Sequence, residues 1–414
     1  MNKIIEKLNG KRILIWGYGR EGKSTEQFIQ TYCHAACLDR YEGSRDGVHE
    51  EKYDIVFVSP GIPFEEDAPL YDNARFTSQT ELFLEEFGAQ TIGITGTKGK
   101  STSCALLYQV LSYCKKKTYL VGNIGKPCFD FIPQLDGESL VVFELSCHQC
   151  QRLQTSPHIA AFLDLYEDHL DRYHTMEHYF DAKCGITKHQ TKDDILLVGS
   201  NVPPITTKAM QIRIAPGSEG KAQGTDDSFF PERFDLLIPG EHNQFNARFV
   251  YKIAVSLLHC DPSQVKQGMA SFAGLPHRLE HCGTIDGVEY YDDSISTIPE
   301  ATIRAVLSVP NAKTVLIGGM DRGIDYGNLE QFIRKHQDIY FILAYASGKR
   351  IYNVLQDCPN VEYVETLEEQ VKRAKEITPK GGAVIMSNAA ASYGYFKDFE
   401  ERGNVFKQLI RSCE

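Results

Sequence analysis

The stretch Gly93-Ile94-Thr95-Gly96-Thr97-Lys98-Gly99-Lys100-Ser101-Thr102 decides the fold class of this chain. Its first residues end a short apolar run, 91–95, and a helix-compatible run, 104–111, follows it. The glycines let the backbone N–H groups turn toward an anion, the helix N-terminus adds its dipole, Lys100 adds positive charge, and Ser101 offers a hydroxyl to Mg²⁺. This order of strand, glycine-rich turn and helix predicts an α/β protein with a cradle for a triphosphate.

The loop departs from the strict phosphate-loop pattern. That pattern has its first glycine where this chain has Ile94, and the glycines here are Gly93 and Gly96. A chance Gly-Lys-Ser sequence is the alternative, but the flanking strand and helix disfavour it. We therefore expect ATP to bind at Gly96, Thr97, Lys98, Gly99, Lys100, Ser101 and Thr102.

Composition predicts an ordinary globular protein of two to four domains. The chain has 414 residues, 42% of them hydrophobic and 24% charged. The formal net charge of −11 comes without any basic tract, so nucleic acid is not an expected partner. No apolar run reaches 18 residues, so we expect no membrane span.

The location and redox state follow from the N-terminus and the cysteines. Residues 1–10 are polar and charged, and the apolar run 13–16 is too short for a signal peptide. We therefore expect a cytoplasmic protein, and a monomer. The twelve cysteines are scattered, as in a reduced protein. Cys147 and Cys150 form a C-x-x-C, which we interpret as local packing, although redox use or half a zinc site would also fit the spacing.

The order of strand-like and helical runs predicts three consecutive α/β domains, with Rossmann-like first and last domains, over residues 1–88, 89–275 and 276–414. Helices are expected at 24–32 and 241–258, and 202–230 is interpreted as loops or a short β excursion. Strands are expected at residues 12–16, 35–38, 55–59, 140–145, 159–163, 195–198, 314–317, 341–346 and 383–387.

A second glycine motif lies in the first domain. Gly17, Gly19 and Gly22 form a G-x-G-x-x-G between a strand and a helix, and Asp39 lies 22 residues after Gly17, at the expected end of the next strand. The motif fits a diphosphate on a helix N-terminus beside a ribose, which NAD and UDP both contain. A purely structural turn is the third possibility, and the ATP loop makes NAD the weaker one.

Acidic and basic side chains follow the central strands. Glu144 ends one of them, where a carboxylate can hold the Mg²⁺ that Ser101 contacts. His169 lies between Asp168 and Asp171 after the next strand, as a metal ligand, a general base or a surface residue. Lys183 cannot ligate Mg²⁺ as an ammonium, but its carbamate with CO₂ can.

Together these motifs resemble the ordered signatures of the Mur ligases over nearly the whole chain. The resemblance rests on the phosphate loop and on nine further segments, which are Asn123-Ile124-Gly125, Glu144-Leu145-Ser146, Asp168-His169-Leu170-Asp171-Arg172-Tyr173, Lys183, Gly240-Glu241-His242-Asn243, His277-Arg278-Leu279-Glu280, Asp292-Asp293-Ser294, Ser387-Asn388-Ala389-Ala390-Ala391-Ser392 and Lys397-Asp398-Phe399-Glu400-Glu401-Arg402-Gly403-Asn404. The last two segments favour the branch that adds D-glutamate to UDP-N-acetylmuramoyl-L-alanine.

The resemblance implies an acyl-phosphate mechanism and assigns residue roles. Lys100 would hold phosphates, Ser101 and Glu144 one Mg²⁺, and His169 and carbamylated Lys183 a second. Asn243, Arg278 and Asp293 would border ATP. Thr297, Arg322, Ser392 and Phe399 would bind glutamate. The UDP substrate would contact Gly17, Gly19, Arg20, Glu21, Gly22, Asp39, Arg40, Ser59, Pro60, Gly61, Asn123 and Ser146.

Three departures bear on specificity. Ile295 stands where the family usually has a lysine, Arg322 stands where a lysine is often found, and Cys147-His148 replaces a small and an aromatic residue. L-glutamate therefore stays open beside D-glutamate as the added amino acid. Parts of the sequence also fit an NAD-dependent oxidoreductase, a non-catalytic nucleotide sensor or a folate-polyglutamate ligase. A change in NADH absorbance would identify the oxidoreductase, and phosphate release would exclude the sensor. The UDP-type first domain argues against the folate-polyglutamate ligase.

Overall fold

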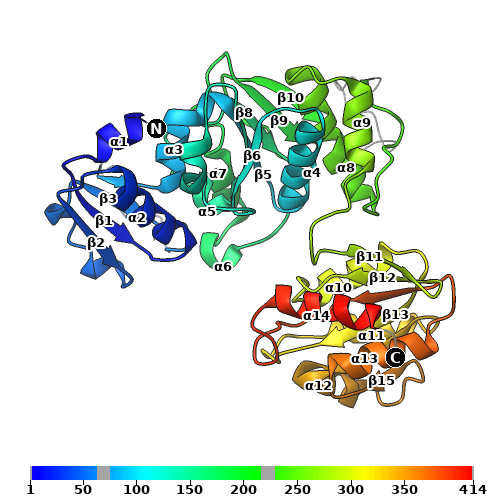
Figure 1. Cartoon of the computed structure of the whole chain (residues 1–414). Helices are drawn as coiled ribbons and strands as arrows, with labels where there is room; N and C mark the ends of the chain where they lie inside the picture. Colours follow the sequence, from blue (N-terminus) through cyan, green and yellow to red (C-terminus); the bar gives the residue numbers. More distant parts are fainter. Residues whose placement is uncertain (1, 63–74, 216–228, 413–414) are drawn as a thin grey trace. The chain divides into compact units, whose positions relative to one another are not determined.

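The computed structural model describes residues 2–62, 75–215 and 229–412, and these residues form three β-sheets with helices on them, as the predicted α/β class requires (Figure 1). Two compact units contain the sheets. Met1–Asp235 and His242–Ala270 form the first unit, and Leu236–Glu241 and Ser271–Glu414 form the second. The first unit holds two sheets and the second holds one, while the division into three domains at residues 88 and 275 stays a prediction.

The first sheet has the strand order β2-β1-β3-β4 among the described residues, and all its pairs are parallel. Ile13, Ile15 and Phe57 point into a core shared with the second sheet, whereas Leu14 and Trp16 point to the opposite face. The elements are α1 (Asn2–Leu8), β1 (Arg12–Trp16), α2 (Arg20–Tyr32), β2 (Cys37–Tyr41), β3 (Ile55–Val58), β4 (Phe76–Thr77) and α3 (Gln79–Phe87), with short 3₁₀ turns at Arg45–Gly47, Glu50–Lys52 and Gly88–Gln90.

Two element boundaries in this sheet differ from the sequence expectation. Helix α2 begins at Arg20 rather than residue 24, because Gly17, with φ of 90°, and Gly19, as N-cap, complete the turn early. Strand β2 begins at Cys37 rather than residue 35, because Cys37 pairs with Arg12 at the start of β1. Asp39 therefore lies in the middle of β2, and the expectation that it ends the strand is wrong.

The second sheet has the strand order β10-β9-β8-β5-β7-β6 among the described residues, and it is parallel throughout. Helix α4 packs on β5, β6, β7 and α9. Strands β8, β5 and β7 are neighbours, so the residues after them meet at one edge. The elements are β5 (Thr91–Thr95), α4 (Lys100–Tyr113), β6 (Thr118–Gly122), a 3₁₀ helix (Cys128–Gln134), β7 (Leu140–Glu144), α5 (Cys147–Cys150), β8 (Ile159–Phe162), α6 (Leu170–Tyr173), α7 (Met176–Cys184), β9 (Ile195–Gly199), β10 (Met210–Ile214), α8 (Glu241–Tyr251) and α9 (Pro262–Ala270).

The segment expected as a helix over 241–258 is α8 followed by a π-helical stretch, Lys252–Leu257. The expected β excursion in 202–230 is β10, which pairs with β9. Residues 216–228 of that segment lie outside the described residues. Across the part of the chain that the structure describes, every helix is too short or too polar to cross a bilayer.

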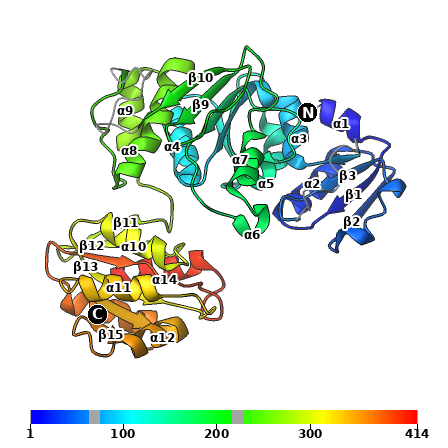
Figure 2. The same cartoon turned by 180° about the vertical axis from the view of Figure 1, so that it is seen from behind.

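The third sheet has the order β11-β12-β16-β13-β14-β15 among the described residues, with β11 antiparallel to β12 and the other pairs parallel. Alternating strand residues feed two cores, so that α10, α11 and α12 cover one face and α13 and α14 the other (Figures 1 and 2). The elements are β11 (Glu280–Ile285), β12 (Val288–Asp292), α10 (Pro299–Leu307), β13 (Ala312–Gly318), α11 (Gly327–Lys335), β14 (Tyr340–Ala344), α12 (Tyr345–Leu355), β15 (Val361–Tyr363), α13 (Leu367–Ile377), β16 (Ala383–Met386) and α14 (Phe399–Arg411).

Strand β14 ends two residues before the expected boundary at 346. Tyr345 adopts a left-handed φ of 63°, which turns the chain out of the sheet and into α12.

Candidate active site

The phosphate loop turns between β5 and α4 as the sequence predicts. Gly96 has a φ of 154° and Gly99 a φ of 76°, and α4 begins at Lys100. A Cβ on Gly99 would lie 2.5 Å from Asn246 Oδ1 on α8. Glycine is therefore required at this position both for the backbone conformation and for the close approach of α8. Ser101 and Thr102 lie half-buried in the first turn of α4.

Two lysines meet at the first turn of this loop. Lys100 Nζ donates to the carbonyl oxygens of Gly96 and Thr97 at 3.0 Å each. Lys183 Nζ, from α7, donates to the same Gly96 oxygen at 2.7 Å and is 1% exposed. Burial, and then the nearby positive charge of Lys100, lower the pKa of Lys183 to about 8. An appreciable fraction of this amine is therefore uncharged near neutral pH.

A carboxylate that the sequence motifs did not single out binds the loop amides. Asp164 follows β8, and its Oδ1 accepts from the backbone N–H groups of Thr97 and Lys98 at 2.8 Å each. Burial raises the pKa of this carboxyl. The hydroxyl of Tyr179 and the backbone N–H of Tyr166 both donate to Thr97 Oγ1. The first amides of the loop are thus held by the protein itself.

Glu144 lies at the end of β7, next to β5. Its side chain is 1% exposed, and its Oε1 accepts from Asn123 Nδ2 at 3.1 Å. Its Oε2 is buried and has no hydrogen-bond partner among the described residues. A buried carboxylate oxygen without a donor is costly unless a cation or another ligand satisfies it. The donor is an oxygen, as Mg²⁺ prefers, so this residue fits the role of a magnesium ligand.

His169 lies at the exposed start of α6 with a left-handed φ of 54°. Its ring centroid lies 6.0 Å from that of Tyr179, and Lys183 Nζ lies 4.6 Å from the centroid of the same tyrosine ring. Tyr179 is therefore a common neighbour of His169 and Lys183. Asp168 lies 3.6 Å from Lys98 Nζ.

The glycine turn of the first domain packs tightly on itself and against the loop after β3. A Cβ on Gly22 would lie 2.4 Å from the Gly17 carbonyl oxygen, so only glycine fits there. Ser59 Oγ donates to the same oxygen at 2.5 Å. Pro60 and Gly61 continue the Ser59 loop as a turn, and a Cβ on Gly19 or Gly61 would meet no atom within 4 Å among the described residues. The open side of the turn is the side on which a diphosphate is predicted.

The neighbouring charged residues join the first sheet to the second. Arg20 donates to the Gly125 carbonyl oxygen, and Gln149 Nε2 donates to Glu21 Oε1 at 2.7 Å. Loss of hydration raises the pKa of Glu21 to about 7. Gln149 also completes a capping box with Ser146 at the start of α5. Arg20, Glu21 and Ser146 of the predicted UDP set are therefore close together.

Asp39 and Arg40 have other partners than this group. Asp39 accepts from the Tyr53 hydroxyl at 2.8 Å, and Arg40 pairs with Glu26 while its guanidinium stacks 4.6 Å from the Tyr18 ring centroid. The β2 residue whose carbonyl oxygen accepts from Gly17 N is Tyr41. The β2 residue beside the glycine turn is thus Tyr41, two positions after Asp39.

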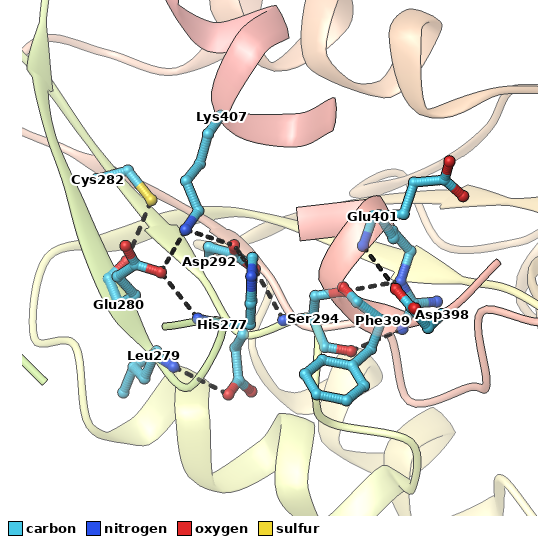
Figure 3. Close-up of polar contacts among 12 residues, drawn as sticks. His277, Leu279, Glu280, Cys282, Asp292, Ser294, Asp398, Phe399, Glu401 and Lys407 are labelled. Atoms are coloured by element: carbon cyan, nitrogen blue, oxygen red, sulfur yellow. Dashed lines mark hydrogen bonds and ion pairs between the residues drawn. The ribbon is translucent and has the colours of Figure 1, made fainter. Parts of the chain in front are cut away.

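In the second unit, three predicted glutamate-site residues follow neighbouring parallel strands. Thr297 follows β12, Ser392 follows β16 and Arg322 follows β13, and Met320 bridges to Ala391 next to Ser392. Arg322 is exposed, Thr297 is half-buried and Ser392 is buried. Phe399 begins α14, and its carbonyl oxygen accepts from Ser294 Oγ at 2.8 Å (Figure 3).

Asp293 is the most perturbed carboxyl group at this edge of the sheet. It accepts from the hydroxyl groups of Ser296 and Ser387 at 2.5 and 2.7 Å and from the backbone N–H of Leu279 at 3.1 Å. Burial nevertheless raises its pKa to about 6. Arg278, next to Leu279, is exposed and is one of the charges that act on Asp293.

A buried guanidinium, to which the sequence analysis assigned no role, ties the same loops together. Arg402 of α14 is 0% exposed and donates to Ser294 Oγ at 3.0 Å, to the Ser294 carbonyl oxygen at 2.7 Å and to the Ala390 carbonyl oxygen at 3.2 Å. It fixes the loops after β12 and β16. Asn243 lies on α8 in the first unit, whereas Arg278 and Asp293 belong to the second, so an ATP site shared by these three stays a prediction.

These features define a class of protein, and the chain belongs to the Mur ligase family. The model of the Mur ligase middle domain matches residues 94–253, which include the phosphate loop, Glu144, His169 and Lys183. The UDP-N-acetylmuramoylalanine--D-glutamate ligase of Aquifex aeolicus (strain VF5) is 33% identical over 96% of this chain and 98% of the relative. The protein of the same name from Geotalea uraniireducens (strain Rf4) is 32% identical over 99% of both.

Solved structures share the fold. The UDP-N-acetylmuramate-alanine ligase MurC of Thermotoga maritima has a TM-score of 0.61 and 17% identity, over 96% of this chain and 98% of that chain. The MurF ligase of Thermotoga maritima in complex with ADP has a TM-score of 0.57 and 16% identity, over 98% and 95%. At these identities the likeness is one of fold.

Proposed function

We propose that this protein is an ATP-dependent ligase that adds D-glutamate to UDP-N-acetylmuramoyl-L-alanine in cytoplasmic peptidoglycan precursor synthesis. The observation that carries the proposal is the phosphate loop in which Lys100 and Lys183 both bond to the Gly96 carbonyl oxygen. The names of relatives similar over 96–99% of the chain supply the substrates.

The chemistry is a transfer of phosphate followed by amide formation. The alanine carboxylate attacks the γ-phosphorus of ATP, which releases ADP and forms an acyl phosphate. The glutamate amine then attacks the acyl carbon, loses a proton, and phosphate leaves. Lys100 neutralises phosphate charge, and the loop positions the reacting groups. Mg²⁺, when bound, would neutralise the phosphate oxygens further and orient them.

The donor set supports two magnesium ions. Ser101 and Glu144 would hold the first, since Glu144 Oε2 is buried without a donor among the described residues. His169 and a carbamate on Lys183 would hold the second. The lowered pKa of Lys183 supports the carbamate, because the uncharged amine is the form that adds to CO₂ and then loses a proton.

Carbamylation has a direct test. Protein equilibrated with ¹³C-bicarbonate at neutral pH is expected to give one carbamate carbonyl resonance, and Lys183→Met is expected to lose it. A spectrum without that resonance in the wild type would count against a second magnesium site built on Lys183.

The substrates are assigned to three groups of residues. ATP would meet the loop 96–102 with Asn243, Arg278 and Asp293. Glutamate would meet Thr297, Arg322, Ser392 and Phe399, whose loops follow neighbouring strands. The sugar nucleotide would meet Gly17, Gly19, Arg20, Glu21, Gly22, Arg40, Ser59, Pro60, Gly61, Asn123 and Ser146, and Asp39 is the weakest member of this set.

Phosphate release is the decisive assay. The full-length protein is incubated with ATP, Mg²⁺ and UDP-N-acetylmuramoyl-L-alanine, and D-glutamate or L-glutamate is added. We expect release that depends on all substrates and is faster with D-glutamate. Faster release with L-glutamate, which Ile295 keeps open, would change the amino acid and leave the ligase chemistry. No release with either, or turnover of NADH, would refute the proposal.

A further inference from the structure

A cluster of soft metal donors lies beside the phosphate loop. Cys147 Sγ, a nitrogen of His148 and a nitrogen of His169 all lie within 4.8 Å of one another. The Sγ atom is 3.7 Å from His148 Nδ1, and the ring centroids of the two histidines are 5.2 Å apart. Cys147 is 3% exposed, His148 is half-buried and His169 is exposed, so solvent reaches the cluster from the His169 side.

The spacing suits a tetrahedral zinc-type ion. With Zn–S near 2.3 Å and Zn–N near 2.0–2.1 Å, a sulfur and a nitrogen on one ion lie about 3.6 Å apart. For the pair of Cys147 and His148, the observed 3.7 Å needs almost no adjustment. One thiolate and two imidazoles are donors that Zn²⁺ and Co²⁺ accept readily, whereas Mg²⁺ prefers oxygen. Three protein ligands leave a fourth position open.

The scaffold holds the donors without a metal ion. The capping box of Ser146 and Gln149 fixes the first turn of α5, which carries Cys147 and His148. The Tyr173 hydroxyl lies 2.7 Å from His148 Nδ1, and the two rings stack at an interplanar angle of 19°. A metal ion at Nδ1, the nitrogen whose distance to the thiol fits, replaces this hydrogen bond.

We propose that Cys147, His148 and His169 bind a zinc-type divalent ion, and that this ion inhibits the ligase. The Cys147 thiol loses its proton to solvent when the metal ion binds. The binding site goes beyond the proposed function, but the inhibition rests on it, because His169 is also the residue assigned to the second Mg²⁺. A zinc-type ion on His169 removes that ligand from the magnesium site.

Cobalt is the probe for the binding site. Full-length protein, freed of metal by a chelator, is titrated with CoCl₂ in the absence of ATP and other substrates. We expect one equivalent to produce a thiolate-to-cobalt charge-transfer band in the near ultraviolet, and ZnCl₂ to remove it. A wild-type protein that gives no such band with stoichiometric Co²⁺ would overturn the proposal.

Matched variants assign the ligands. Cys147→Ser is expected to lose the band and to weaken Zn²⁺ binding by at least about 100-fold. Cys150→Ser is the control, because it changes a buried cysteine of the same helix that lies outside the cluster. It is expected to retain both the charge-transfer band and the Zn²⁺ affinity of the wild type. His148→Phe keeps the thiol and is expected to weaken binding as well. Retention of the band in Cys147→Ser would show that another cysteine binds the ion and would refute the site.

Inhibition is measured separately from binding. With Mg²⁺ at saturation, micromolar ZnCl₂ is expected to slow phosphate release by the wild type and by Cys150→Ser, and to leave Cys147→Ser active. Equal inhibition of all three would refute the regulatory part. A protein without ligase activity would still show the cobalt band if the site exists, so failure of the proposed function and failure of this inference are distinguishable.

Discussion

The carboxylate of Asp292 lies 2.7 Å from Nδ1 of His277, and both side chains are buried (Figure 3). His277 has a φ of 62° and Leu279 a φ of 45°, so the loop at the start of β11 is strained at two non-glycine residues. Asp292 contacts the His277 ring, and Asp293 accepts a hydrogen bond from the backbone N–H of Leu279. The end of β12 therefore fixes the loop that presents Arg278.

The contact between His277 and Asp292 leaves no room for a side chain on the facing helix. A Cβ on Gly403 would lie 2.0 Å from His277 Nδ1 and 2.4 Å from Asp292 Oδ2. Alanine is the better helix former by about 1 kcal/mol, but the overlap outweighs this gain. We expect Gly403→Ala to lower the free energy of unfolding by about 1–3 kcal/mol, measured by urea unfolding of the full-length protein.

Gly327→Ala is the matched control for that substitution. Gly327 begins α11 in the same unit, and the nearest atom to its added Cβ is the flexible carboxylate oxygen of Asp325 at 3.3 Å. We expect a change within about 0.5 kcal/mol. Equal stability of Gly403→Ala and Gly327→Ala would mean that the His277–Asp292 pair moves freely away from α14.

Glu144 offers a test in which activity falls and stability does not. Glu144→Gln keeps the shape of the side chain and removes the charge of a buried carboxylate whose Oε2 has no donor among the described residues. We expect phosphate release to fall by at least about 100-fold, because the magnesium ligand is lost, while the protein unfolds at the same or a higher urea concentration. Glu138→Gln changes an exposed glutamate and is expected to alter neither quantity. Normal turnover in Glu144→Gln would remove this residue from the magnesium site.

Lys183 predicts a pH-dependent stability. Its pKa falls from the ordinary value of 10.5 to about 8 in the folded chain. Well below pH 8 Lys183 is protonated in both states. Between about 8 and 10.5 the unfolded chain binds more protons, so the free energy of unfolding rises with pH in that window. The rise is roughly 3 kcal/mol for a shift of this size. The free energy of unfolding is measured with urea in CO₂-free buffer for the wild type and for Lys183→Met, and the difference between the two isolates the contribution of Lys183. A difference that stays constant from pH 8 to pH 10 contradicts the lowered pKa.

The phosphate loop was predictable because its information is local. Gly96, Gly99 and Lys100 lie within five consecutive residues, and each has a backbone or charge requirement that can be read from its type. Asp164 was not predictable in the same way. It lies 67 residues beyond Thr97, and it reaches the loop amides only because β8 is placed next to β5 in the sheet.

Register explains the error at Asp39. Motif spacing locates an acid about 20 residues after the first glycine, but pairing of Cys37 with Arg12 determines which β2 residue lies beside the turn. The buried contacts of the second unit were missed for a similar reason. Arg402 and Ser294 are 108 residues apart in the sequence. A charged residue in an amphipathic C-terminal helix is expected to face solvent, and only the packing of α14 against β12 shows that this one is buried.

Arg322 is the residue on which glutamate recognition is expected to depend most. It is exposed on the loop after β13, beside the loop that carries Ser392, and Ile295 supplies no cation near them. A guanidinium binds a carboxylate through two parallel hydrogen bonds, each charge-assisted. We expect Arg322→Ala to raise the KM for glutamate by at least about 10-fold and to leave the KM for ATP within about 2-fold, from phosphate-release kinetics at saturating UDP substrate.

Arg304→Ala separates this effect from a general loss of positive charge. Arg304 is an exposed arginine of α10 in the same unit, so its removal changes the net charge equally and leaves the β13 loop intact. We expect its KM for glutamate to equal that of the wild type. Both variants are measured with D-glutamate and L-glutamate. Binding of glutamate by both Arg322 and Ser392 would favour one enantiomer over the other. If Arg322→Ala and Arg304→Ala give the same KM for both enantiomers, Arg322 is a surface residue, and glutamate binds elsewhere on the chain.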